Sequence, residues 1–71
     1  MSNGCEAGKN SWPELVGCLG KTAEKKIEYQ NRNVNAILIP EGSAVTLDFR
    51  CDRVWVWINE AGKVVRTPVI G

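Results

Sequence analysis

The sequence predicts a small single domain of the α+β class, in which one helix precedes two strands that are joined by a long loop. Three observations carry this prediction: a run of helix-compatible residues before the middle of the chain, two apolar runs typical of strands, and a long connection between those runs. With 71 residues the chain lies near the lower limit for one hydrophobic core. This length favours an external binding surface over an enzyme cleft between two domains.

The amino-terminal part divides into an arm and the start of the domain. Residues 1–10 are polar and contain glycine, so we expect a flexible arm there and a folded domain over 11–71. The arm lacks the apolar core of a signal peptide. The stretch SWPELVG that follows predicts a single helical turn, which Ser11 caps and Gly17 ends. We expect Trp12 to anchor the core, because an aromatic side chain buries a large area.

The helix and the first strand follow. Residues from 21 or 22 to about 31 are compatible with a helix, on which Ala23 and Ile27 share the apolar face. Residues 34–39 predict a strand. Its apolar run Ala36–Ile39 does not alternate, so we expect that strand to be covered on both faces.

The second strand, residues 53–59, alternates in period two and leads to a return segment. Its side chains divide into one apolar face and one mixed face, respectively Val54, Val56 and Ile58, and Arg53, Trp55 and Trp57. A turn at 60–63 predicts a short return strand at 64–65. Pro68 then keeps the final segment, 67–71, at an edge of the sheet, because proline cannot donate to a ladder.

The composition excludes several classes of function. The net charge is +1, and no apolar run approaches the ~20 residues of a membrane span, so we expect neither a nucleic acid nor a membrane as partner. The chain has no histidine, and therefore lacks the usual general base and the commonest metal ligand. We expect no enzymatic activity, no metal and no cofactor.

The three cysteines, at positions 5, 18 and 51, contain no CxxC pair and allow at most one disulfide beside a free thiol. Three pairings are open at this point. The simplest interpretation of Cys18 is a small apolar filler. The compartment stays open: a disulfide favours an extracellular or vacuolar protein, and a cytosolic one remains an alternative.

Function is expected in the loop from Pro40 to Arg50, because long loops without their own secondary structure are usually functional. In an extended segment Thr46 and Asp48 point to the same side and Leu47 to the other. A guanidinium group from either arginine that follows, Arg50 or Arg53, is close enough in sequence to donate to the Thr46 hydroxyl and the Asp48 carboxylate.

Two interpretations of this loop compete. In the first, it is a braced, extended peptide that offers the apolar side chain of Leu47 to a pocket. In the second, the arginines are ordinary surface charges and Leu47 is an incidental exposed leucine, which is common in folded proteins.

Four segments together resemble the potato inhibitor I family of serine protease inhibitors. These are SWPELVG at 11–17, the VTLDFR and DRV segments between 45 and 54, and the final segment 68–71. They occur in the family's order and spacing, and the resemblance extends from about residue 9 to residue 71. It implies a wedge-shaped α+β fold with one helix packed on a small mixed sheet and a binding loop at the edge.

The resemblance also implies a standard-mechanism inhibitor and assigns roles in the loop. Leu47 would occupy the primary specificity pocket of chymotrypsin-like and subtilisin-like proteases, and Leu47–Asp48 would be the reactive-site bond. Val45, Thr46 and Phe49 would make further contacts. Serine endopeptidases are therefore the expected partners, and the chain is expected to act as a monomer.

Below the loop, the resemblance implies that Arg53 and Arg50 brace it and that the carboxylate of Gly71 lies near them. The family often has a second arginine two residues after Arg53, where this chain has Trp55, so we expect its indole to shield or stack in that place.

The resemblance to a plant subset of the family implies a disulfide between Cys5 and Cys51, which leaves Cys18 as the spare thiol. A competing hypothesis is a non-inhibitory binding module that uses the face of Trp55 and Trp57 as its partner surface.

Overall fold

The computed structural model describes residues 9–46 and 48–71, and within them one α-helix packs on a three-stranded sheet. The elements are, in chain order, the 3-10 helix η1 (Pro13–Leu15), the helix α1 (Gly20–Gln30), and the strands β1 (Asn35–Pro40), β2 (Arg53–Ile58) and β3 (Val69–Ile70). This is the small α+β domain that the sequence predicts. No helix in the described part of the chain is long and apolar enough to cross a membrane.

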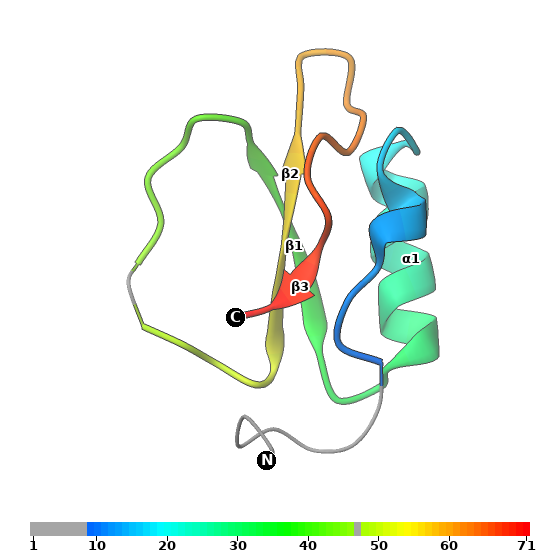
Figure 1. The fold of residues 1–71 in the computed structure, drawn as a ribbon, viewed down its shortest axis with the longest axis vertical. Helices are drawn as coiled ribbons and strands as arrows, with labels where there is room; N and C mark the ends of the chain where they lie inside the picture. The colour runs from blue at the N-terminus through cyan, green and yellow to red at the C-terminus, as the bar shows by residue number, and fades with distance from the viewer. Residues whose placement is uncertain (1–8, 47) are drawn as a thin grey trace.

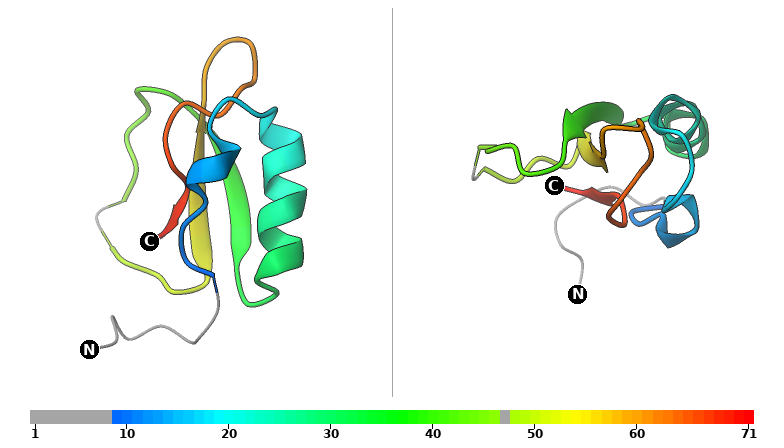
Figure 2. Two further views of the ribbon diagram at one scale, coloured as in Figure 1. Left: turned by 45° about the vertical axis from the view of Figure 1, so that its right-hand side comes forward. Right: turned by 90° about the horizontal axis from the view of Figure 1, so that it is seen from above.

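The sheet is mixed, with the strand order β1-β2-β3. β1 and β2 run parallel, with Asn35 opposite Arg53 and Pro40 opposite Ile58, and β3 pairs antiparallel to β2. Because the first two strands are parallel, the chain must return along their whole length between them. The described residues of this return, 41–46 and 48–52, form an open loop on the opposite side of the strands from α1 (Figures 1 and 2).

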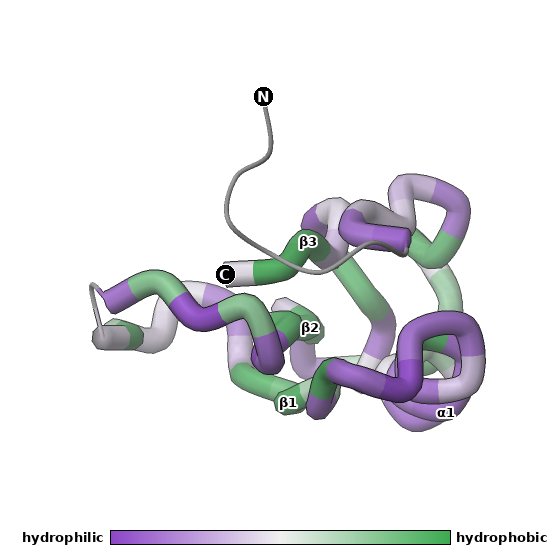
Figure 3. Tube along the Cα trace, turned by 90° about the horizontal axis from the view of Figure 1, so that it is seen from below, coloured by the Kyte–Doolittle hydropathy of each residue, from purple (hydrophilic) through white to green (hydrophobic). Residues whose placement is uncertain are grey.

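The core lies between α1 and one face of the sheet. Ala23 and Ile27 of the helix and Val54 and Val56 of β2 are fully buried in one cluster. Hydrophobic residues concentrate on the strands, whereas most of α1 is hydrophilic (Figure 3). Trp12 is also fully buried, as predicted. Only a narrow stripe along α1 is apolar, so the helix depends on packing against the sheet for its stability.

Two side-chain hydrogen bonds connect the helix to its neighbours. The Trp12 indole N–H donates to Gln30 Oε1 at 2.9 Å, which satisfies the polar atom of this buried ring. Glu28 Oε2 accepts the backbone N–H of Ala36 at 2.9 Å, at the start of β1. Together these contacts fix α1 against both η1 and the sheet.

The start of α1 requires a glycine. A Cβ atom at Gly20 would lie 2.8 Å from Ile58 Cγ2, closer than packed side chains allow. The Gly20 N–H donates to the carbonyl oxygen of Gly62 at 2.7 Å. The helix therefore begins in direct contact with the end of β2 and the turn that follows it.

Three local predictions were wrong. Ser11 does not cap η1: Trp12 occupies the cap position, and no side-chain cap bond forms in this described turn. β1 is not covered on both faces, since Ile37 is 40% exposed on the face away from α1. Residues 64–65 do not form a strand. Val64 makes a single bridge to Ile58 instead, because the turn before it brings only one residue pair into register.

Candidate functional site

The loop begins with a tight turn that is tied to the sheet. The Glu41 N–H donates to the Ile58 carbonyl at 2.7 Å, and the Ser43 N–H donates to the Pro40 carbonyl at 3.1 Å. Gly42 between them has φ +88°, a conformation that L side chains rarely adopt. The first three loop residues are thus held at the end of β1 and β2.

Beyond this turn the loop projects from the sheet. In its described parts, residues 44–46 and 48–50, no backbone–backbone hydrogen bond ties it to the rest of the chain. Thr46, Asp48 and Phe49 are exposed, and Val45 is half-buried. Leu47, the predicted reactive-site residue, lies outside the described residues.

Arg53 connects the loop to the sheet. It is the first residue of β2 and is largely buried. Its Nη2 donates to the carbonyl oxygen of Asp48 at 2.9 Å, and its Nη1 lies 3.6 Å from the Asp48 carboxylate. A planar guanidinium with several donors suits such a double contact. The residue that follows Leu47 is therefore held from below by both its backbone and its side chain.

The same guanidinium is anchored on its other side by the end of the chain. Arg53 Nε donates to the carbonyl oxygen of Gly71 at 2.7 Å, and the Gly71 N–H donates back to the Arg53 carbonyl at 2.9 Å. The bond from Nε limits the rotation of the arginine side chain, and the backbone bond holds Gly71 beside the start of β2. Gly71 thus lies in contact with Arg53, and its role in bracing the loop stays a prediction.

Thr46 joins this network through Asp48. The nearby Thr46 hydroxyl, followed by the positive charge of Arg53, lowers the pKa of Asp48 below its ordinary value. The arrangement differs in detail from the expectation that an arginine would donate to Thr46 directly. Thr46 and Asp48 flank Leu47, so the two neighbours of that residue are linked to each other and to Arg53.

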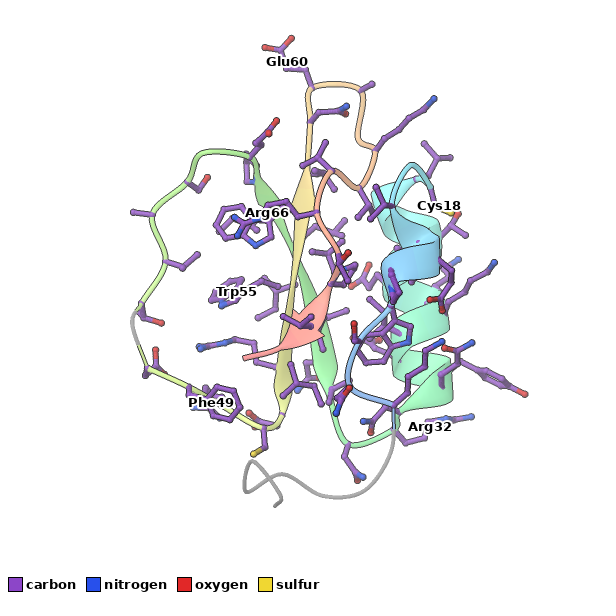
Figure 4. The ribbon with its side chains drawn as sticks, in the orientation of Figure 1. Cys18, Arg32, Phe49, Trp55, Glu60 and Arg66 are labelled. Carbon is purple, nitrogen blue, oxygen red and sulfur yellow. The ribbon has the colours of Figure 1, made fainter. Side chains whose placement is uncertain are left out.

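Two arginine–tryptophan stacks lie on the loop side of β2. The Arg53 guanidinium carbon is 4.7 Å from the Trp55 ring centroid, as the expected stacking requires. The Arg66 guanidinium carbon is 4.8 Å from the Trp57 ring centroid. In Figure 4 Trp55 and Arg66 lie between β2 and the loop. Sequence reasoning missed Arg66. No local pattern in the sequence pairs it with Trp57, because the turn after β2 brings the two residues together.

Arg50 contacts Asp52, near the end of the loop. Its Nε and Nη2 both donate to the Asp52 carboxylate at 2.9 Å, in an exposed pair. These bonds lower the pKa of Asp52. Asp52 also holds the start of β1, since its carbonyl oxygen accepts the Asn35 N–H at 2.9 Å. Arg50 therefore orders the exit of the loop, and a direct brace by Arg50 stays a prediction.

Of the three cysteines, the structure describes Cys18 and Cys51. Cys18 is a half-buried free thiol that packs against the core. Cys51 is half-buried and has an interaction partner. Cys5 lies outside the described residues, so the Cys5–Cys51 pairing stays a prediction. Among the residues that the structure describes, no cluster of three or more acidic or cysteine side chains could hold a metal ion.

Comparison with known proteins places the chain in a family. The model of the potato inhibitor I family matches residues 3–71. A proteinase inhibitor of Linum usitatissimum is 59% identical over 63 residues, which cover 89% of this chain and 91% of the relative. A trypsin/subtilisin inhibitor of Amaranthus caudatus is 56% identical over 61 residues, which cover 86% and 88%. The crystal structure of bitter gourd trypsin inhibitor matches with a TM-score of 0.90 and 54% identity, over 92% of this chain and 96% of that one. The chain therefore belongs to the potato inhibitor I family.

Proposed function

We propose that this chain inhibits serine proteases by presenting residues 43–50 as a substrate would, with Leu47 in the primary pocket and Leu47–Asp48 as the reactive-site bond. The observation that carries the proposal is the double contact of Arg53 with Asp48, the first residue after that bond. Val45, Thr46 and Phe49 flank the bond and contact the enzyme. The relatives that the chain resembles are named as proteinase, trypsin and subtilisin inhibitors, which supports this assignment.

The bracing explains how a substrate-like loop inhibits. A flexible peptide loses conformational entropy when it binds, whereas a loop that is already extended has met this cost during folding. The catalytic serine attacks the carbonyl carbon of Leu47 and releases the amine of Asp48. Because Arg53 holds the backbone carbonyl of Asp48, this amine stays beside the acyl-enzyme and re-forms the peptide bond faster than water hydrolyses the ester.

Trp55 and Gly71 make the brace more rigid. The Trp55 ring covers the Arg53 guanidinium on one face, and the Gly71 carbonyl accepts from its Nε. Both contacts reduce the conformations open to the arginine, so less entropy is lost when it holds Asp48. In this proposal Trp55 takes the structural place of the second arginine, and Arg50 supports the loop's exit through Asp52.

The side chain at position 47 decides which proteases bind. An apolar pocket, as in chymotrypsin-like and subtilisin-like enzymes, accepts leucine, whereas a pocket with a buried carboxylate selects lysine or arginine. We therefore propose apolar-pocket proteases as targets, with one protease bound per monomeric inhibitor. Trypsin, named for two of the relatives, should be inhibited less well by this chain.

Active-site titration of three proteases tests this proposal. The wild type should inhibit chymotrypsin and subtilisin stoichiometrically, and Leu47→Lys should improve trypsin inhibition by on the order of 100-fold or more. Val16→Lys is the matched control, because Val16 is a 45% exposed apolar residue far from the loop, and it should change nothing. If the wild type inhibits trypsin best and the swap has no effect, the reactive-site assignment is wrong.

The competing module hypothesis has less support. It requires the rings of Trp55 and Trp57 to be open to a partner, yet an arginine of this chain lies over each of them. We also propose the Cys5–Cys51 disulfide, which would tie the arm to the loop's exit. Peptide mapping without reduction should recover those two peptides linked, and a linked peptide that contains Cys18 would refute the pairing.

A further inference from the structure

The second stack, Trp57 with Arg66, lies at the opposite end of β2 from Arg53, which contacts Asp48. Arg53, Trp55 and Trp57 share one face of the strand, and the first and last are four residue steps apart along it, about 13 Å. The two stacks have nearly the same geometry, 4.7 and 4.8 Å between guanidinium carbon and ring centroid. One face of β2 thus carries two supports of the same chemistry.

Each stack lies beside a different half of the loop. The register pairs Ile39 with Trp57 and Pro40 with Ile58, so the loop leaves β1 at the end of the sheet where Trp57 stands. It returns at Arg53, at the other end. The half of the loop before Leu47 therefore starts next to Trp57 and Arg66, and the half after Leu47 ends at Arg53.

Within the described residues, the half of the loop before Leu47 is not held by backbone hydrogen bonds beyond its first turn. Residues 44–46 make no backbone–backbone hydrogen bond among the described contacts. Val45 is nevertheless half-buried, whereas its neighbours Ala44 and Thr46 are exposed. Val45 is therefore partly covered by the rest of the molecule, unlike its two neighbours.

Arg66 is well placed to fix the Trp57 ring. The residues just before it are tied to the sheet and to η1's exit: the Val65 N–H donates to the Trp57 carbonyl at 2.9 Å, and the Val64 N–H donates to the Cys18 carbonyl at 2.8 Å. The backbone that carries Arg66 is therefore ordered. A cation held over one face of the indole leaves the ring fewer orientations.

We propose that Trp57 and Arg66 form a positioning pair for the half of the loop that precedes Leu47. Arg66 fixes the indole, the indole supports Val45, and the Leu47 carbonyl is thereby held in one place. This inference rests on the proposed inhibitory function. It extends that function to the residues on the acyl side of the reactive-site bond, which are Leu47 and those before it. Arg53 keeps the released amine in place, and the pair keeps the acyl group aligned with it for re-formation of the bond.

The test compares Arg66→Gln, Arg66→Lys and Trp57→Phe with the control Lys63→Gln, which removes an exposed cation from the turn before Arg66. The first readout is ¹⁵N relaxation of residues 44–46 in the free inhibitor, which needs no protease. The second is the rate at which subtilisin cleaves Leu47–Asp48 on long incubation. Arg66→Gln should lower the order parameters and speed cleavage roughly two- to fivefold, with a thermal midpoint equal to that of Lys63→Gln. Arg66→Lys and Trp57→Phe should lie between it and the wild type.

Each outcome decides a different question. If Arg66→Gln matches Lys63→Gln in loop order and cleavage while Arg53→Ala is cleaved fast, the positioning role is wrong and the inhibitory function stands. If Arg66→Gln weakens inhibition without a change in the order of the free loop, Arg66 touches the protease directly, and the proposal is again wrong. If the wild type inhibits none of the proteases, the proposed function fails, and the relaxation data still decide whether the pair orders the loop.

Discussion

On one face of β2, Val54 and Val56 are fully buried beneath α1, whereas on the other face Trp55 and Trp57 are half-buried beneath the loop and each meets an arginine. The two faces alternate residue by residue along a single strand. The first contributes to the free energy of unfolding through apolar burial, and the second contributes to the geometry of the loop through cation contacts. Variants of the two faces should therefore separate stability from inhibition.

The largest effect is expected from the core face. Ile27 is fully buried against β2, and Ile27→Ala should lower the free energy of unfolding by about 2–5 kcal/mol, because it removes buried methyl groups and leaves a cavity. Guanidinium chloride denaturation measures this. Under conditions where the variant stays folded, its loop should be cleaved by subtilisin at the wild-type rate. Rapid cleavage of the folded variant would show that the two faces are not independent.

The next effect is expected from the loop face. Arg53→Ala removes hydrogen bonds of a charged group worth roughly 1.5–3 kcal/mol, so cleavage of Leu47–Asp48 should become roughly 10- to 100-fold faster. The free energy of unfolding should fall much less than in Ile27→Ala. Arg53→Lys, which keeps the charge but loses the planar fork, should be intermediate. If the Arg53→Ala protein resists cleavage for as long as the wild type, another residue braces the loop.

The smallest effect is expected from acid. The Thr46 hydroxyl and the Arg53 charge lower the pKa of Asp48 from its ordinary value of 3.8, so the carboxylate contacts are complete above that pH and are lost as pH falls through the lowered pKa. Amide chemical shifts of Thr46 and Asp48 should therefore be constant from neutral pH to about 4 and should move only in stronger acid. Asp48→Asn should abolish this transition. A transition of the same size in that variant would assign it to another carboxyl group.

The fold was largely predictable where one pattern had one meaning. The alternation in residues 53–59 predicted which side chains of β2 face the core, and the structure confirms it for Val54 and Val56. The unbroken run in β1 had two meanings, since a strand of that composition is covered either on both faces or on one. Ile37 stays 40% exposed because a loop, not a second helix, passes over its face.

The candidate site was predictable only where its partners are close in sequence. Arg53 and Asp48 are five residues apart, and their contact followed from an extended loop above a strand. Arg66 and Trp57 come together only through the turn after β2, whose register no local pattern indicates. Arg50 lies two residues from both Asp48 and Asp52, so sequence distance does not decide its partner, and the structure pairs it with Asp52.

The parallel pairing of β1 with β2 has a further consequence for a chain cut between residues 47 and 48. The first piece would hold η1, α1 and β1, and the second would hold β2 and β3, so the sheet itself joins them. Backbone hydrogen bonds from Trp12 to Pro68 and from Glu41 to Ile58 also cross between the pieces. The two new ends would stay at an effective concentration of the order of millimolar or above, as in a short tether. Separately made fragments 1–47 and 48–71 should accordingly assemble into one particle, which makes the fold suitable for use as a split protein.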